Sequence, residues 1–289
     1  MTTNNYYSNL RKYHNQIKRE YLNEYTRKIN DTHEIKLLDM CCGCGGDLNK
    51  WISNRKIKHV VGIDISQQFI SEAHQRLVNT RNTNDTIINF YVGNLGTVSV
   101  CHLIPTKFDI ITCHFSMHYF FEDKNKYHFF MTNVKNSLRP GGYFICTILD
   151  MYQINIILDL AKDSSDDNSN CSGNCNKYES ELLYIERHYN KNSNNNRKSS
   201  LFGHEILFNL KNTKYFDDTG PSKEYLIDYK LLIESLKNVY GLDIVDTILF
   251  SEIKMGSTRE KMSSVETEAS DLNRLMVFQK KVNVRRNYT

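Results

Sequence analysis

The chain has 289 residues, of which 40% are hydrophobic and 24% charged; it is long enough to bury a substantial core in one large domain or two small ones. No stretch approaches the roughly 18 consecutive apolar residues that span a bilayer, and the N-terminus lacks the apolar run of a secretory signal, so retention in the cytosol or nucleus is expected. The net charge of +4 is too small for a protein held mainly by duplex phosphates, but it suits a ligand that carries a few phosphates.

An amphipathic helix is predicted first, over residues 6–29, where Tyr, Leu and Ile recur at near-helical spacing. Strand-like and helix-like segments then alternate, which is typical of a parallel sheet. The predicted strands cover residues 35–41, 59–65, 87–93, 108–116 and 143–149. The predicted helices cover residues 47–53, 66–80 (with Ser66 as N-cap) and 123–138, the last stopped by RPGG at residues 139–142, and the fourth strand is reached without a clear helix before it.

The pattern changes after residue 150. The predicted helices here cover residues 151–162 and 229–241, the second ending at the C-cap Gly241. The predicted strands cover residues 177–189, 201–210, 242–253 and 273–284, with a polar loop between the last two. Two Asn/Ser-rich stretches, residues 164–176 and 190–200, are expected to be disordered surface loops. We therefore predict one doubly wound α/β domain with an antiparallel insertion after the fifth strand, its sheet completed by the last two strands.

Eight cysteines would suggest a disulfide framework only in a much shorter, secreted chain. Several lie in or beside apolar runs, so reduced thiols that act as small hydrophobes are expected. The alternative is a zinc site that pairs Cys41 and Cys44 with Cys171 and Cys175. That site is disfavoured because the first pair lies in a glycine loop and no His-x-x-x-His follows.

A glycine loop follows the first predicted strand and contains Gly43, Gly45 and Gly46. Ligands of open parallel sheets bind at the carboxyl ends of the strands, and glycine allows their close approach to the backbone. The spacing is G-x-G-G-D rather than the dinucleotide fingerprint G-x-G-x-x-G, which disfavours a dehydrogenase. The loop therefore indicates a nucleotide-like ligand of another kind.

Asp64 ends the second predicted strand, where a carboxylate can accept hydrogen bonds from both ribose hydroxyls of an adenosyl group. The alternative is that Asp64 only caps the next helix, although Ser66 is better placed to do so. Asn94, just past the third strand, can meet the adenine edge.

A run of histidines and aromatics, HFSMHYFF at residues 114–121, follows the fourth strand. Phe120 and Phe121 can be ordinary core residues. His118 and Tyr119 emerge from a strand end into the expected cleft, so they are candidate site residues.

Together these segments resemble class I S-adenosylmethionine-dependent methyltransferases, and one branch closely: the mRNA cap guanine-N7 methyltransferases. Two segments separate this branch from other class I enzymes: YHNQIK at 13–18 is similar to the family's F-N-N-W-x-K, and EYLIDY at 224–229 is similar to E-[FY]-x-V-x-F. The remaining matches are LDMCCGCGGDL at 38–48 (family L-D-L-G-C-G-K-G-G-D-L), DI at 64–65, FSMHY at 115–119 and RPGGYFI at 139–145.

The resemblance implies a Rossmann-like class I methyltransferase with a mostly parallel seven-stranded sheet and helices on both faces. Its expected parts are an N-terminal helix (6–29), a cofactor-binding core (33–150), an insertion (151–241) with disordered loops near 163–176 and 190–200, and closing strands (242–289). The implied reaction moves a methyl group from S-adenosylmethionine to N7 of the guanine in a GpppN RNA cap, leaving S-adenosylhomocysteine and using no metal. Guanine N7 has a lone pair and no proton to lose, so no residue is expected to act as a catalytic acid or base.

By the same resemblance, the partner is 5′-capped RNA, with association with a capping enzyme or RNA polymerase as a further expectation. A monomer without membrane attachment is expected, in the nucleus, or in the cytoplasm if the chain is viral or parasite-specific.

The resemblance also assigns roles to residues. Lys18 would meet the methionine carboxylate of the cofactor, and Glu224 would accept hydrogen bonds from guanine N1–H and N2–H₂ together, which adenine cannot offer. The full cofactor-binding set is Lys18, Cys41, Gly43, Asp64, Asn94, His114 and Tyr119. The cap-binding set is His14, Asn15, Lys50, Arg76, His118 and Glu224. For Lys50 and Arg76, the alternative is that they are solvated charges on helix faces.

Four positions depart from the family pattern. Cys41 replaces the first glycine of the loop, and Cys44 replaces its lysine, a cap contact. His14 replaces the first of two asparagines, and Asn273 replaces a tyrosine in the last strand. One phosphate contact and one stacking partner are therefore expected to be missing, and Cys41 is expected to be compatible with the fold only if its backbone needs no positive φ.

Two other functions stay open at this point. The first is a class I methyltransferase with a small-molecule or protein acceptor. The second is a degenerate, non-catalytic binding subunit, motivated by Cys41, Cys44 and Asn273. Measurement of S-adenosylmethionine binding would separate the second from the enzymes.

Overall fold

The computed structural model describes residues 8–29, 33–163, 176–189, 200–211 and 220–282. The two stretches predicted to be disordered lie outside these residues, apart from residues 176 and 200. Cys171 and Cys175, the second half of the alternative zinc site, lie outside them as well. In the part of the chain that is described, no group of three or more His, Cys, Asp or Glu residues is arranged to hold a metal ion.

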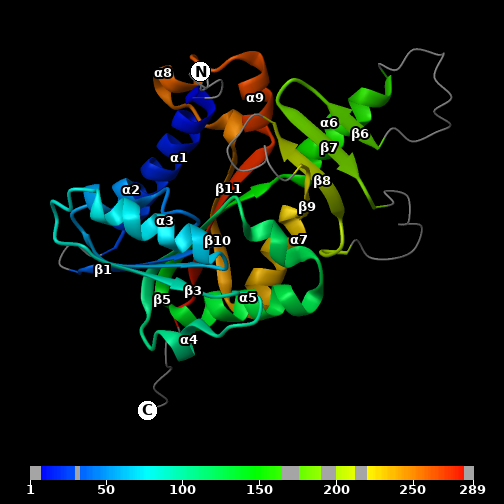
Figure 1. The fold of residues 1–289 in the computed structure, drawn as a ribbon. Coiled ribbons are helices and arrows are strands. Elements are labelled where there is room, and N and C mark those ends of the chain that lie inside the picture. The colour runs from blue at the N-terminus through cyan, green and yellow to red at the C-terminus, as the bar shows by residue number, and fades with distance from the viewer. Residues whose placement is uncertain (1–7, 30–32, 164–175, 190–199, 212–219, 283–289) are drawn as a thin grey trace.

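A seven-stranded sheet forms the centre of the fold, with strand order β10-β11-β5-β4-β1-β2-β3 (Figure 1). Strands β1 to β5 pair in parallel with one another, and β11 is antiparallel to both β10 and β5. The strands are β1 (Ile35–Met40), β2 (Ile57–Asp64), β3 (Ile87–Val92), β4 (Phe108–His114), β5 (Leu138–Leu149), β10 (Leu242–Leu249) and β11 (Asn273–Lys280). The predicted fold class is confirmed, and the chain order of the strands reverses between β1 and β4, where ligands of such sheets bind.

Helices cover both faces of the sheet because strand side chains alternate between them. In β5, Phe144 and Cys146 belong to the core under one set of helices, whereas Tyr143 and Ile145 belong to the core under the other. The first set is α5 (Lys124–Ser137) and α7 (Tyr229–Ser235) with the π-helical turn η2 (Leu236–Tyr240). The second set is α1 (Ser8–Arg27), α2 (Leu48–Ser53) and α3 (Gln67–Val78).

Local capping signals set several helix ends as predicted. The Ser66 hydroxyl accepts a hydrogen bond from Phe69 N at 3.2 Å and begins α3. Gly241, with φ +68°, ends the α7–η2 segment in the left-handed conformation that glycine adopts without strain.

The insertion after β5 consists of α6 (Met151–Asp163) and a separate antiparallel sheet. Its strands, in spatial order, are β6 (Lys177–Glu179), β7 (Leu183–Arg187), β8 (Glu205–Leu210) and β9 (Ser222–Tyr225). Ile154 and Leu158 of α6 share a buried core with Leu183, Ile185 and Ile206 of this sheet. The predicted antiparallel insertion is present, and β9 is a strand that the sequence pattern did not indicate.

Several local predictions are wrong. A short helix, α4 (Val100–Leu103), precedes β4, and β5 begins at Leu138, so the predicted breaker lies inside the strand. The predicted strand 242–253 ends at Leu249 and is followed by η3 (Phe250–Glu252), and the predicted polar loop contains α8 (Gly256–Arg259) and α9 (Ser264–Asp271).

The physical reason for α9 is partly local and partly tertiary. Ser263 and Glu266 form a capping box at its start. Glu266 also accepts hydrogen bonds from Asn9 N and Leu10 N at 3.2 and 2.9 Å, which satisfies donors at the start of α1. Figure 1 shows α1, α8 and α9 together at one end of the molecule.

The backbone of Cys41 has φ +62°, so the expectation that Cys41 is compatible with this fold only without a positive φ is wrong. Phe115, at the end of β4, is also left-handed, with φ +55°. Such a conformation costs a non-glycine residue about 1–2 kcal/mol and persists only where the surroundings enforce it. Both positions lie at the carboxyl ends of the central strands, where β1 and β4 are neighbours.

We expect Cys41→Gly to raise the free energy of unfolding by about 1 kcal/mol, because glycine adopts this φ without strain. Gly43→Ala is the opposite substitution and serves as the matched comparison. Gly43 has φ +52°, and an added Cβ would meet no atom within 4 Å. Backbone strain alone should therefore lower the free energy of unfolding of this variant by about the same amount. Urea unfolding of the three proteins measures both changes. If Cys41→Gly is less stable than wild type, the inference that the Cys41 backbone is strained is contradicted.

Candidate functional site

The glycine loop after β1 is fixed to the end of β2 by the carboxylate of Asp64. Gly43 N donates to Asp64 Oδ2 at 2.8 Å, and Ser66 N donates to Asp64 Oδ1 at 2.9 Å. Asp64 thus stabilises the start of α3, which agrees in part with the alternative that it caps this helix, although the N-cap residue itself is Ser66. Each carboxylate oxygen has further lone pairs, so Asp64 can still accept hydrogen bonds from a ligand.

Asn94 lies just beyond β3, near the end of β2, because Gly93 N donates to the carbonyl oxygen of Asp64 at 2.8 Å. Its side-chain oxygen accepts from Gly96 N at 2.9 Å, which holds the side chain in a local turn. The predicted adenosine-binding pair, Asp64 and Asn94, is therefore brought to one edge of the sheet.

Asp47, at the end of the glycine loop, forms ion pairs with the buried Lys50 and the partly buried Lys18. Asp47 Oδ1 lies 2.7 Å from Lys18 Nζ and 2.6 Å from Lys50 Nζ. Lys50 Nζ also donates to Asn15 Oδ1 at 2.7 Å, so this cluster joins α1 to the loop and α2. This cluster thus brings together three residues predicted for the site, Lys18, Lys50 and Asn15. Asp47, which joins them, was not predicted as a site residue and appeared only as the last residue of the G-x-G-G-D pattern.

The electrostatics of this cluster explain its stability. Burial alone would raise the pKa of Asp47, but the charges of Lys18 and Lys50 outweigh burial and hold that pKa below its ordinary range. Burial and the charge of Asp47 raise the pKa of the neighbouring Asp39 to about 7, although Thr112 Oγ1 donates to Asp39 at 2.6 Å. Asp47 is therefore the permanent anion that holds Lys18 in place.

An aromatic stack lies beside Lys18. The ring of His14 stacks on Phe115 at 5.2 Å and meets the edge of Phe250 at 5.1 Å, and Lys18 Nζ lies 5.8 Å from the Phe115 ring centre. Burial lowers the pKa of His14 to about 3, so its ring is neutral. Phe250 is a site neighbour that the sequence did not indicate, because it lies near the end of the predicted strand 242–253, where no motif points to a site.

Asn273, at the position where the family has a tyrosine, has a structural role here. Its amide nitrogen donates to the carbonyl oxygens of Ala269 and Ser270 at 3.1 and 3.0 Å and closes the end of α9. Ser270 in turn hydrogen-bonds with His14 Nε2 at 3.1 Å. The aromatic surface at this end of the site comes from Phe115 and Phe250 instead.

His118 and Glu224 form a buried polar pair between the core and the insertion. His118 lies in η1 (Met117–Phe121), Glu224 lies in β9, and His118 Nε2 is 3.4 Å from Glu224 Oε2. Glu224 Oε1 accepts from Ser222 Oγ at 3.0 Å, whereas neither ring nitrogen of His118 has a partner with hydrogen-bond geometry among the described residues. Tyr119 packs edge-on against His118 at 4.2 Å and stays 44% exposed.

Burial controls the charge of this pair. It lowers the pKa of His118 to about 3 and raises the pKa of Glu224 to about 8. His114, at the end of β4, is similarly neutral because burial lowers its pKa to about 3, and its Nδ1 has no partner among the described residues. Buried polar groups with so few partners are typical of positions that bind a ligand.

The raised pKa of Glu224 predicts how stability depends on pH. Because the folded protein holds this proton more tightly than the unfolded chain does, stability falls as pH rises from 4.5 towards about 8. Glu224→Gln removes the titration, so it should stabilise the protein at pH 9 by on the order of a few kcal/mol and have little effect near pH 4.5. Urea unfolding at both pH values measures this, with the exposed Glu234→Gln as control. If the free energies of unfolding of wild type and Glu224→Gln change by the same amount between the two pH values, this prediction is contradicted.

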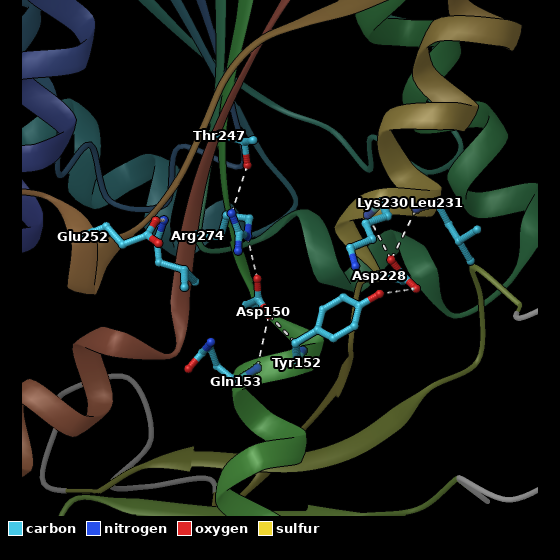
Figure 2. A network of polar contacts seen from close by, with 10 residues as sticks. Asp150, Tyr152, Gln153, Asp228, Lys230, Leu231, Thr247, Glu252 and Arg274 are labelled. Atoms are coloured by element: carbon cyan, nitrogen blue, oxygen red, sulfur yellow. Dashed lines mark hydrogen bonds and ion pairs between the residues drawn. The ribbon is translucent and has the colours of Figure 1, made fainter.

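A buried network around Asp150 anchors the segment that carries Glu224 (Figure 2). Asp150 lies at the end of β5, pairs with Arg274 Nε of β11 at 2.5 Å, and accepts from Tyr152 N at 2.8 Å to begin α6. It also forms a β-bridge with Ile227, three residues after Glu224. The position of Glu224 is therefore tied to the central sheet and not only to the insertion.

Arg76 of α3 lies beside the glycine loop, with Nη2 3.6 Å from Cys44 Sγ. A pocket of about 410 Å³ opens here, and its lining includes Arg76, Lys50 and Asn15. The structure thus arranges the predicted residues in three groups: Asp64 with Asn94, the Lys18–Asp47–Lys50 cluster with its pocket, and His118 with Tyr119 and Glu224.

Comparison with known proteins gives a consistent result. The sequence family described as the mRNA (guanine-N(7))-methyltransferase domain matches residues 3–286. The mRNA cap guanine-N(7) methyltransferase of Drosophila melanogaster is 30% identical over 159 residues, which are 50% of this chain and 37% of that protein. The enzyme of the same name from Saccharomyces cerevisiae is 30% identical over 253 residues, 84% of this chain and 52% of that protein. A probable mRNA-capping enzyme of Acanthamoeba polyphaga mimivirus is 27% identical over 270 residues, 84% of this chain and 22% of that protein.

The chain thus spans about half, or less, of the length of these curated relatives. Among solved structures, an S-adenosylmethionine-dependent methyltransferase from Clostridium acetobutylicum is similar with a TM-score of 0.52 at 18% identity, covering 96% of this chain and 92% of that one. Magnesium protoporphyrin IX methyltransferase from Synechocystis, solved with bound S-adenosylhomocysteine, has a TM-score of 0.53 at 12% identity, covering 94% and 86%. These likenesses show the fold.

Proposed function

The chain belongs to the mRNA (guanine-N(7))-methyltransferase family, and from this premise we propose that it transfers the methyl group of S-adenosylmethionine to N7 of the guanine in a GpppN RNA cap. Relatives named mRNA cap guanine-N(7) methyltransferase match 50% of this chain in one case and 84% in another, which supports the proposal.

The observation that carries the proposal is the buried pair of Glu224 and His118. Glu224 is 3% exposed, and among the described residues Ser222 is the only hydrogen-bond donor to its carboxyl group. Guanine N1–H and N2–H₂ present two adjacent donors that a carboxylate accepts together, and adenine has no such pair. Binding of guanine would therefore supply two donors to a carboxyl group whose ionised form burial alone disfavours.

The residues present fit S-adenosylmethionine at the other half of the site. Asp64 has lone pairs free for the ribose hydroxyls, and the loop backbone around Gly43 permits close approach. Lys18 has three N–H donors, of which Asp47 takes one, so it can also meet the methionine carboxylate. Asn94 and Tyr119 would complete this half, with Cys41 and His114 beneath it.

When bound, S-adenosylmethionine supplies an already activated methyl group next to a positively charged sulfur. The chain has to position the guanine in line with that group, which is worth several orders of magnitude in rate. His14, His114 and His118 are neutral, so they add no positive charge that would oppose the sulfonium. No side chain has to remove a proton, because N7 attacks through its own lone pair.

The direct test is incubation of GpppA-capped RNA with methyl-labelled S-adenosylmethionine, followed by nuclease digestion. We expect the label in m7GpppA. Label on a 2′-oxygen, or on a small molecule or protein but not on the cap, would replace this function by another methyltransferase activity. Binding of S-adenosylmethionine in calorimetry without any transfer would favour a non-catalytic subunit.

The proposal also covers the substrate, the cellular compartment and the associated proteins. Capped RNA is the proposed substrate, in the nucleus or, for a viral or parasite chain, in the cytoplasm, with a capping enzyme or RNA polymerase as the proposed associated protein. None of the helices in the described residues is long and apolar enough to cross a membrane.

A further inference from the structure

The pocket beside the glycine loop has an entirely cationic set of charged residues: Arg11 and Arg19 of α1, Lys50 of α2 and Arg76 of α3. Gly45 and Gly46 contribute backbone to the same pocket, and none of the described residues that line it is a carboxylate. Arg11 and Arg19 were not indicated as site residues by any sequence motif. They are exposed at their outer ends, so their charges can reach a ligand from solution.

The two arginines of α1 lie on one face of that helix. Arg11, Asn15 and Arg19 are spaced by four residues each, which places them one above another along the pocket wall. Asn15, between them, accepts from Lys50 Nζ, so the wall is fixed to the floor of the pocket.

These arginines have no counter-charge of their own. Among the carboxylates of the described residues, none forms an ion pair with Arg11, Arg19 or Arg76, whereas Lys50 is paired with Asp47. Burial, opposed by Asp47 and aided by Lys18 and Arg19, lowers the pKa of Lys50, which places the charge of Arg19 close to it. The charges of the three arginines repel one another, and a bound polyanion would remove that repulsion.

We propose that Arg11 and Arg19 bind phosphate groups at the 5′ end of the RNA. This inference rests on the proposed function and deepens it. Guanidinium groups bind phosphate with two parallel hydrogen bonds, and glycine backbone permits a phosphate to approach closely. Helix α1 thereby supplies phosphate contacts that the thiol of Cys44 in the loop cannot supply. The phosphates are those of the cap triphosphate or those of the first transcribed nucleotides, which have the same chemistry.

The test compares binding by wild type and Arg11→Gln/Arg19→Gln. The matched control is Lys12→Gln/Arg27→Gln, which removes two exposed cations of α1 that do not line the pocket. The probes are GpppA dinucleotide, GpppA-capped RNA of about ten nucleotides, and S-adenosylhomocysteine, titrated at several salt concentrations.

We expect the double arginine variant to bind capped RNA at least about tenfold more weakly, with a smaller salt dependence. Binding of S-adenosylhomocysteine should stay within about twofold of wild type, which also shows that the variant is folded. Equal loss for the dinucleotide would assign the arginines to the triphosphate, and loss for the RNA alone would assign them to the transcript. Arg11→Lys/Arg19→Lys should keep the salt dependence and lose part of the affinity, because the charge stays but the paired hydrogen bonds do not.

Affinity of the double arginine variant within about twofold of wild type, or an equal loss in the lysine–arginine control, would overturn the inference. If that happens while the wild type still produces m7GpppA, only this inference fails. If the wild type transfers no methyl group to the cap and binds no capped RNA, the proposed function fails and this inference with it.

Discussion

Glu224→Gln is expected to lower kcat/KM for GpppA-capped RNA by about 10³-fold while S-adenosylmethionine binding changes little. The carboxylate is the one group in the described structure proposed to accept two guanine donors at once. Glutamine keeps the size of the side chain but replaces one acceptor with an amide that points donors at a donor. The loss should be divided between KM and kcat, because a poorly held guanine is also poorly aligned with the methyl group.

The control for this prediction is Glu234→Gln, an equal change on the exposed side of α7. Initial rates with capped RNA and calorimetry with S-adenosylmethionine give the two measurements. If Glu224→Gln retains full activity on capped RNA, Glu224 does not recognise guanine, and the proposal loses the observation that carries it. If cofactor binding falls as far as activity does, the substitution has disturbed the fold rather than cap recognition.

Asp47→Asn is expected to lower the free energy of unfolding by about 3–5 kcal/mol, because removal of one partner of a buried ion pair leaves the other charge without compensation. Here the buried Lys50 and the partly buried Lys18 depend on the same carboxylate oxygen. Asparagine keeps the shape and one acceptor but not the charge. Lys18 would also lose its fixed position, so S-adenosylmethionine should bind more weakly.

A second substitution makes this prediction specific. In the Asp47→Asn background, Lys50→Met should recover part of the lost stability, since it removes one of the unpaired cations and fills the space with an apolar chain of similar length. Glu24→Gln, which breaks the exposed pair with Lys28 on α1, is the control and should change stability by less than about 0.5 kcal/mol. Chemical denaturation measures all four proteins. A small effect of Asp47→Asn, similar to that of Glu24→Gln, would mean that the cluster is well solvated.

Much of the fold could be predicted because its signals are local. The apolar runs of β1, β2, β4 and β5 and the glycine loop after β1 identify a parallel sheet and its ligand-binding edge. The Ser66 cap and the Gly241 terminus depend on atoms a few residues away, so their residue types alone were informative. The family resemblance added the candidate residues, and the structure brings most of them to the same sheet edge.

The predictions that failed concern residues whose conformation depends on contacts with residues distant in the sequence. The segment before β11 reads as a polar loop, yet it is helical because Glu266 binds the start of α1 and Leu272 enters the insertion core. Cys41 is expected from the sequence to be compatible with the fold only without a positive φ, yet its surroundings hold it at φ +62°. Asn273 reads as a lost aromatic, although it closes the end of α9.

The sequence by itself determined the class of fold, the cofactor loop and the family, because those follow from periodicity and motifs within short windows. Only the tertiary structure decided which charges meet: Asp47 with Lys18 and Lys50, His118 with Glu224, and Arg11 with Arg19 and Arg76 around one pocket. The physical reason is that burial and Coulomb interactions depend on distance in space. A lysine on α1 or a glutamate on β9 therefore acquires its partner, its pKa and its proposed role only after the chain has folded.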